Sequence, residues 1–408
     1  MKKRCLSAVA ALCILLGSLA LTSCSDKAAD TPTSAPSVTL GGTAATAPEI
    51  DLSACTFDIS GDCGDNATWK MDSAQGVLVI SGTGSMKKYN GATDSPWYAN
   101  SSLKHIVIEN GITEITANAF TVCDKLESIS IPASVGKISP EAFLDCSSLK
   151  TIGISQHNTI FKNVDGVIYS ADTTELLIYP AGLEATEFTV PASVKTVGRY
   201  AFASSAYLEK IVVPAGVELI GFRAFHNCDA LVDAVLPESG VTLEAGIFDH
   251  CDKLANVTLP TDIASIPQMT FLSCPSLVSV SIPESVTKIE LKAFMNCTSL
   301  TSVVLPSKVE AIESMAFSGC TNLASITLPE GLKVIGGSSD SLNGGVKVFE
   351  NCLALKNITI PASVEVMGSN TFAGWNADQT INLHSASIGD GWHPTWNHSC
   401  SAVINNIA

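Results

Sequence analysis

The sequence is poor in charged residues, and especially in basic ones. Only 15% of its 408 residues are charged, and 23 lysines and arginines stand against 39 aspartates and glutamates, for a formal net charge of −16. An acidic excess of this size repels a phosphate backbone, so we expect no binding of nucleic acid through a basic face. Leucine, valine, isoleucine and phenylalanine are plentiful, which excludes general disorder.

Long hydrophobic runs and catalytic motifs are also missing. After residue 21 no apolar run is long enough to span a bilayer. The sequence has no G-x-S-x-G, no H-E-x-x-H and no papain-like cysteine context, and the stretch Gly82–Lys87 lacks the spacing of a phosphate-binding loop. We therefore expect neither enzymatic activity nor a cofactor.

The N-terminus has the pattern of an export signal. Lys2, Lys3 and Arg4 precede an apolar run over residues 8–21, which predicts a signal peptide over 1–23. The run ends in LTSC, which resembles the lipobox of bacterial lipoproteins and implies cleavage before Cys24 and acylation of its thiol. An ordinary signal peptide with an incidental cysteine is the alternative. Residues 24–52 are rich in Ala, Thr, Ser, Pro and Gly, which predicts a flexible tether to a lipid anchor in the membrane.

Most of the remaining chain repeats with a period of 23 residues. Prolines keep this period, and phenylalanines precede recurring cysteines by three residues. The unit Leu277–Ser299 shows the consensus L-x-x-I-x-I-P-x-x-V-x-x-I-x-x-x-A-F-x-x-C-x-x. The residues that mark this ladder are Cys123, Cys146, Cys228, Cys251, Cys274, Cys297, Cys320, Cys352, Phe120, Phe143, Phe225, Phe248, Phe271, Phe294 and Phe317.

Each repeat has the composition of one coil of a solenoid. The first, fourth and sixth residues point inward from a strand, and the proline ends that strand because it cannot donate to a ladder. The V-x-x-I stretch supplies the opposite wall, and A-F and the cysteine fill the interior at the return. Coils of this kind bury their apolar face only against one another. About eleven coils are expected, with insertions near 155–184 and 336–345 that we expect to form loops and candidate contact surfaces.

The motif I-P-x-x-V-x-x-I-x-x-x-A-F-x-x-C-x-x-L is nearly intact at 282–300 and 305–323. It resembles the Treponema-type leucine-rich repeat of BspA-like surface proteins, over about residues 103–375. The resemblance implies a β-strand-rich leucine-rich-repeat solenoid with short helical or irregular returns, capped at both ends. The repeats would span 103–354, an N-terminal β cap 53–102, and the last repeat with a C-terminal cap 355–408. Within the first cap, Trp69–Asp72 and Gly76–Ser81 are expected to form a hairpin.

The cysteines and histidines offer little chemistry in this pattern. A secreted context favours disulfides, but the repeat cysteines share one inward position, which favours a buried ladder of free thiols. A bridge between Cys55 and Cys63 is left open, and Cys400 has no evident partner. His393, His398 and Cys400 are close in sequence, but they do not supply the four ligands at defined spacing that a zinc site usually has, so no metal is expected. His226 and His250 fall at the variable return corner.

The outward positions of the first strand are mostly serine, threonine and small apolar residues, as in Ser279, Ser281 and Thr327. Extended solenoid faces usually bind proteins or glycans, although such residues also suit any soluble strand, so no binding residue can be named. The BspA resemblance implies attachment to host matrix proteins and to other bacteria. We therefore expect a lipid-anchored protein of the bacterial cell envelope, exposed at the surface, that binds an extracellular protein or glycan as an adhesin or ligand-capture module. The alternative is a structural envelope protein without a specific ligand.

Overall fold

The computed structural model describes residues 48–337, 345–384 and 389–407. The expected signal peptide, Cys24 and most of the expected tether lie outside the described residues, as does most of the 336–345 insertion. No helix within the described ranges is long and apolar enough to cross a membrane.

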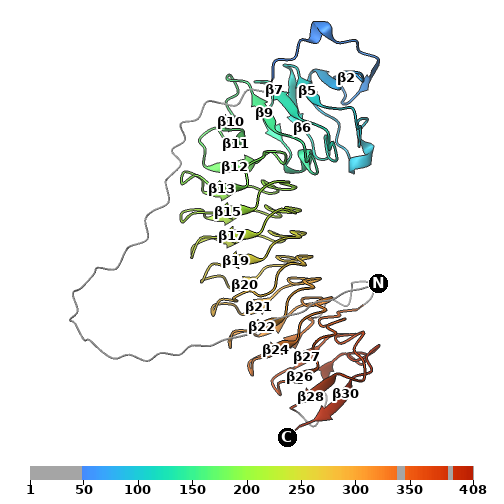
Figure 1. The fold of residues 1–408 in the computed structure, drawn as a ribbon, viewed down its shortest axis with the longest axis vertical. Coiled ribbons are helices and arrows are strands. Elements are labelled where there is room, and N and C mark those ends of the chain that lie inside the picture. The colour runs from blue at the N-terminus through green and yellow to red at the C-terminus, as the bar shows by residue number, and fades with distance from the viewer. Residues whose placement is uncertain (1–47, 338–344, 385–388, 408) are drawn as a thin grey trace, which may run out of the picture. The chain divides into compact units, whose positions relative to one another are not determined.

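The described chain forms a parallel β-solenoid of about 13 turns. Two ladders of short parallel strands run along it, and residues 23 apart pair directly, as Ser302 does with Ser325 (Figure 1). The first ladder contains β3 (Val77–Gly82), β5 (His105–Ile108), β7 (Ser128–Ile131), β9 (Thr151–Ile154), β13 (Glu187–Thr189), β15 (Lys210–Val212), β17 (Asp233–Val235), β19 (Asn256–Thr258), β22 (Ser302–Val304), β24 (Ser325–Thr327), β26 (Asn357–Ile360), β28 (Thr380–Leu383) and β30 (Val403–Asn406).

The second ladder lies on the opposite wall and is interrupted in places. It contains β4 (Gly84–Ser85), β6 (Ile112–Ile115), β8 (Lys137–Ile138), β12 (Glu175–Ile178), β14 (Thr196–Val197), β16 (Leu219–Ile220), β18 (Thr242–Leu243), β20 (Ser265–Ile266), β21 (Lys288–Ile289), β23 (Ala311–Ile312), β25 (Val334–Ile335), β27 (Val366–Met367) and β29 (Gly391–Trp392). Helix is nearly absent from the described residues: three short 3₁₀ helices cover η1 (Leu52–Ala54), η2 (Ala92–Asp94) and η3 (Pro140–Phe143).

Inward-facing apolar side chains in each coil form the two walls of the solenoid. In β22 the side chain of Val303 is buried while its neighbours Ser302 and Val304 face solvent. Pro306 follows the strand, and Val309 and Ile312 then bury their side chains from the opposite wall. This is the arrangement that the repeat consensus predicts from a period of two within the strand.

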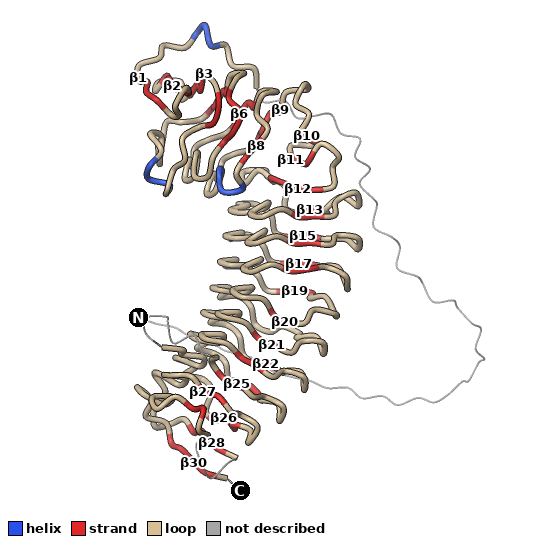
Figure 2. The backbone as a smooth tube through the Cα atoms, turned by 180° about the vertical axis from the view of Figure 1, so that it is seen from behind, coloured by secondary structure: helices blue, strands red, loops and turns tan. Residues whose placement is uncertain are grey.

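The returns between the walls are turns with a recurrent backbone geometry (Figure 2). In the return after β16, Arg223 and Asn227 have φ angles of 54° and 57°, and the corresponding residues of most coils are also left-handed. The N–H groups of Arg223, Phe225 and Asn227 donate to carbonyls of the next coil at 2.9–3.0 Å. Each return is therefore hydrogen-bonded to its neighbour although no strand is formed there.

Aromatic rings form a continuous stack at the returns. Consecutive rings from Phe202 to Phe372 have centroids 5.1–5.9 Å apart. Phe202, Phe349 and Phe372 belong to this stack although the ladder read from the sequence did not include them. Near its end, Trp375 takes the place of a cysteine, and its ring N–H donates to the carbonyl of Phe349 at 2.8 Å.

The repeat cysteines lie beside the phenylalanine stack as buried free thiols. Each repeat thiol from Cys146 to Cys352 donates to the backbone carbonyl of the phenylalanine of the preceding coil, as Cys297 does to Phe271 over 3.1 Å. Burial raises the pKa of Cys274 and of Cys320 to about 12. Cys55 and Cys63 are also unbridged, and Cys400 is a free thiol.

The coil count exceeds the expected eleven because both ends add rungs. At the N-terminal end β1 (Ile59–Asp62) and β2 (Ala67–Asp72) pair antiparallel, β2 forms a hairpin with β3, and β3 pairs in parallel with β5. At the other end β28 and β30 continue the first ladder beyond β26. Their sequences lack the full consensus, which is why the repeat motif alone did not count them.

The 155–184 insertion is built of strands, and the expectation of a loop there is wrong. It contains β10 (Phe161–Val164) and β11 (Val167–Ser170), an antiparallel hairpin that turns at Asp165-Gly166, and β11 pairs with β12. The strand β12 then joins the second ladder by pairing with β14. The hydrophobic core divides at this insertion into one cluster from Cys63 to Ile168 and another from Val164 to Trp396.

Candidate functional site

The outward face of the first ladder lacks charge over its C-terminal part. From β19 to β26 the exposed strand positions carry only Ser, Thr, Asn and Val side chains. In the three strands just before β19, the first outward position is charged instead: Glu187 in β13, Lys210 in β15 and Asp233 in β17. We call the following residues the uncharged strand face: Asn256, Thr258, Ser279, Ser281, Ser302, Val304, Ser325, Thr327, Asn357 and Thr359.

Two aliphatic side chains are exposed on or beside this surface. Val304 is 79% exposed, and Val278, at the edge of the uncharged strand face, is 50% exposed. The neighbouring coils have Ser281 and Thr327 at the position of Val304, whereas Val212 and Val235 occupy it in β15 and β17. Exposed valine surrounded by hydroxyl and amide groups is an arrangement that a partner can cover without desolvating a charge.

A groove of about 350 Å³ adjoins the uncharged strand face. It lies between β24 and β26, which do not pair with each other: β24 pairs with β22, and β26 pairs with β28. The 336–345 insertion falls between these two strands in sequence. The lining residues include Ser325, Thr327, Asn357 and Thr359, so the groove presents the same hydroxyl and amide groups as the face around it.

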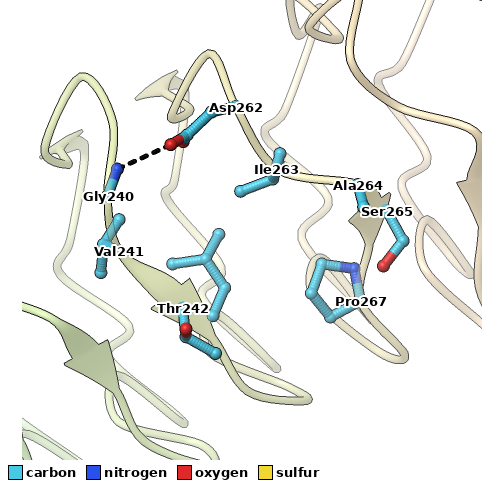
Figure 3. Close-up of a pocket in the computed structure, with 9 residues that line it drawn as sticks. Gly240, Val241, Thr242, Asp262, Ile263, Ala264, Ser265 and Pro267 are labelled. Carbon is cyan, nitrogen blue, oxygen red and sulfur yellow. Dashed lines mark hydrogen bonds between the residues drawn. The ribbon is translucent and has the colours of Figure 1, made fainter.

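A second groove, of about 400 Å³, lies on the opposite wall where the second ladder is interrupted (Figure 3). Gly240 stands at the repeat position where neighbouring coils have the inward side chains of Val217 and Ile263. Its φ is +77°, its N–H donates to a carboxylate oxygen of Asp262 at 2.9 Å, and β18 does not pair with β20. The missing side chain and the broken ladder open the groove, which is lined largely by small and apolar residues.

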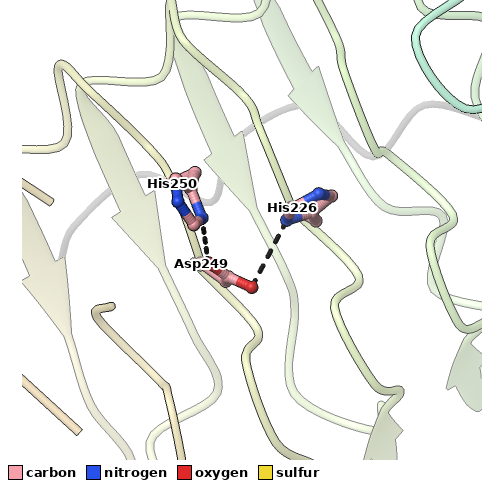
Figure 4. Close-up of side chains that lie close together, drawn as sticks. All are labelled: His226, Asp249 and His250. Atoms are coloured by element: carbon pink, nitrogen blue, oxygen red, sulfur yellow. Dashed lines mark hydrogen bonds and ion pairs between the residues drawn. The ribbon is translucent and has the colours of Figure 1, made fainter. Parts of the chain in front are cut away.

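Within the described ranges one group of histidine and carboxylate side chains lies close enough to share a metal ion: His226, Asp249 and His250 (Figure 4). His393, His398 and Cys400 do not form such a group there. Burial alone would raise the pKa of Asp249, but its contact with His226 and nearby positive charge hold that pKa below its usual value. Both histidines stand out in the sequence, whereas Asp249 was not among the predicted candidates. The available signal was the period itself, since His226 and Asp249 are 23 residues apart.

Comparison with known proteins identifies the repeats. A family model described as BspA type leucine rich repeat region matches in six copies, over residues 94–165, 181–301 and 288–391. The chain belongs to the BspA-type leucine-rich-repeat family. The expected leucine-rich-repeat solenoid is therefore confirmed. This fold is typically a non-enzymatic scaffold for interactions, and no catalytic family is indicated.

Solved structures similar to this BspA-type chain come from several bacteria. A leucine-rich repeat protein from Eubacterium ventriosum is 24% identical with a TM-score of 0.51, covering 72% of this chain and 94% of that one, and shows the shared fold. A leucine rich cell surface protein from Faecalibacterium prausnitzii is 20% identical (TM-score 0.38, covering 71% and 98%). The T. pallidum leucine rich repeat protein TpLRR is 30% identical (TM-score 0.40, covering 48% and 88%). No curated protein matches the chain.

Proposed function

We propose that this protein is a binding module of the bacterial cell surface, held in the envelope by a lipid on Cys24, and that it captures an extracellular protein or glycan. The observation that carries the proposal is the uncharged strand face with its exposed Val304. BspA-type leucine-rich-repeat proteins are surface proteins in bacteria, which supports the location.

The chemistry of the uncharged strand face suits such a partner. Charged residues are depleted at the centres of protein interfaces because burying them costs desolvation energy. Here the charge is missing over successive coils of a chain whose formal net charge is −16. Hydroxyl and amide groups on parallel rungs offer donors and acceptors at regular spacing, and the groove between β24 and β26 gives a concave element beside them.

A binding screen with matched variants tests the proposed face. The full chain, purified in detergent, is applied to arrays of extracellular matrix proteins and glycans, and hits are measured by titration. Val304→Glu should weaken a true interaction at least tenfold because it buries a charge in the interface. Asn322→Glu adds the same charge to an exposed return position and should leave binding unchanged.

The outcome also separates the alternative function. Absence of saturable binding to any extracellular protein or glycan would favour a structural envelope protein without a specific ligand. Equal binding by wild type, Val304→Glu and Asn322→Glu would move the site away from the uncharged strand face.

The anchor is tested separately by phase partitioning. Wild-type protein expressed in a bacterium should enter the detergent phase, and Cys24→Ala should shift to the aqueous phase because no acyl chain can be attached. A Cys24→Ala variant that still partitions into detergent would contradict the lipid anchor.

A further inference from the structure

The return corners of two adjacent coils bring together the histidine and carboxylate group seen in Figure 4. His226 comes from the coil of β16, and Asp249 and His250 come from the coil of β18. The Nδ1 atom of His226 lies 3.5 Å from Oδ2 of Asp249, and Nδ1 of His250 contacts Oδ1 of the same carboxylate. One ligand atom of each of the three residues lies within 4.8 Å of the others.

Burial makes this group unusual among the surface charges of the chain. The Asp249 side chain is 0% exposed, whereas the His250 side chain is 48% exposed and opens the group to solvent. A fully buried carboxylate is costly unless positive charge faces it. Arg223 supplies part of that charge through a 2.8 Å ion pair to Oδ2, which leaves Oδ1 directed at His250.

The surroundings of the two histidines are acidic. Burial raises the pKa of Asp229, and the carboxylates of Asp252 and Asp145 raise it further. Asp229 interacts with His226 and His250 as well, so its carboxylate and that of Asp249 both lie close to the two imidazoles. A divalent cation placed between the imidazoles would offset this negative charge.

We propose that His226, Asp249 and His250 bind a transition-metal dication of the zinc class. Two imidazole nitrogens and one carboxylate oxygen are ligands that suit Zn²⁺, whereas Mg²⁺ and Ca²⁺ prefer oxygen ligands alone. Three protein ligands leave a fourth position of a tetrahedral site for water or for an external group on the exposed side of His250. The ion takes the place of the direct contact between Asp249 and His250, and each imidazole coordinates as the neutral ring.

The fold orients the ligands before the ion binds. His250 has a φ of 59°, one of the left-handed positions that recur in the returns, and its N–H donates to the carbonyl of Leu272 at 2.8 Å. The backbone around Asp249 is held on both sides, since Asn227 donates to its carbonyl at 2.9 Å and its own N–H donates to Gly246 at 3.0 Å. A bound ion would join two coils that already have this geometry.

Metal binding by the purified full chain tests the proposal. The protein is stripped with EDTA, kept reduced, and dialysed against micromolar Zn²⁺, and bound zinc is measured by mass spectrometry. We expect one zinc per chain above the background of the control. His250→Gln should weaken zinc affinity at least tenfold. A loss of about tenfold is already typical when only a residue that hydrogen-bonds a ligand is replaced. His157 is an exposed histidine that is distant in sequence from the proposed ligands, so His157→Gln should bind zinc as the wild type does.

Stability provides a second readout, since an ion that binds only the folded state raises the melting temperature. Zinc should raise the melting temperature of the wild type and of His157→Gln and leave that of His250→Gln unchanged. Circular dichroism in EDTA checks that His250→Gln is folded, which its exposure favours. Absence of stoichiometric zinc in the wild type, or equal affinity in wild type and His250→Gln, would overturn the site. Loss of zinc in His398→Gln instead would assign the ion to the C-terminal segment.

Discussion

The repeat cysteines act in this protein as small buried groups whose thiols stay protonated. Cys297 donates to Phe271 over 3.1 Å, and Cys274 and Cys320, like it, are completely shielded from solvent. A thiolate at these positions would lose its hydration without gaining a positive partner. The cysteine ladder therefore contributes to packing, and ionisation of its thiols affects stability only at high pH.

We predict that stability falls as the pH rises above 9. Burial raises the pKa of Cys274 and Cys320 from an ordinary 9.0 to about 12, so in alkali the native state binds more protons than the unfolded state. Stability then declines with rising pH, from about pH 9 to about pH 12. Urea unfolding followed by circular dichroism at several pH values measures the decline.

Cys320→Ala controls for other groups that titrate in alkali. It should be less stable than wild type near neutrality, because it leaves a small cavity, and should lose stability less steeply above pH 9. Parallel declines in wild type and Cys320→Ala would contradict an origin in this thiol.

At the scale of the coil, the phenylalanine stack is the main interior contact between neighbours. The ring of Phe294 lies 5.3 Å from the rings of Phe271 and Phe317, nearly parallel to both. We predict that Phe294→Ala lowers the free energy of unfolding by about 3–5 kcal/mol, through lost burial and a cavity that the rigid ladders cannot close. Chemical denaturation measures the loss. Tyr207→Ala removes a ring that is 45% exposed and should cost far less, so equal losses would contradict the role of the stack.

The strand and return of each coil could be predicted from the sequence because the same apolar, proline and aromatic positions recur every 23 residues. Val303 and Leu305 are inward because side chains alternate between the two faces of an extended segment, and the repeat places apolar residues at these positions. The hairpin of β2 and β3 was predicted, but β3 and β28 were not counted as rungs of the ladder, because pairing with a neighbour, rather than the consensus, makes them part of it. The strands of the 155–184 insertion were missed because this segment also lacks the consensus, and its strands form by pairing with one another and with β14.

The candidate sites depend on contacts across coils, which a one-dimensional pattern records only in part. The groove at Gly240 follows from one missing side chain together with a ladder that fails to close against β20. The burial of Asp249 follows from the return geometry and from Arg223, which lies one coil away. Both the uncharged strand face and the outward position of Val304 could be read from the sequence, because alternation along the strand turns that side chain away from the core.

At the scale of the whole molecule, the solenoid contains two hydrophobic clusters that meet at the 155–184 insertion. The first ladder has separate sheets on the two sides, ending at β9 and starting again at β13. Polar contacts cross the boundary, such as the 2.7 Å hydrogen bond from the Ser204 hydroxyl to Asp145. Because each coil contacts only its neighbours, stability in such an array is a sum of local terms.

We predict that the two clusters open separately. Phe120→Ala should speed amide hydrogen exchange in β5, β7 and β9 and leave β15 to β24 near wild-type rates, because Phe120 stacks on Phe143 and Trp97 within the first cluster. Phe294→Ala should do the reverse, because its ring contacts only the second cluster. Native-state exchange read by mass spectrometry on peptides measures both. If either variant speeds exchange equally on the two sides of the insertion, the solenoid opens as one cooperative unit, and the two clusters do not unfold independently.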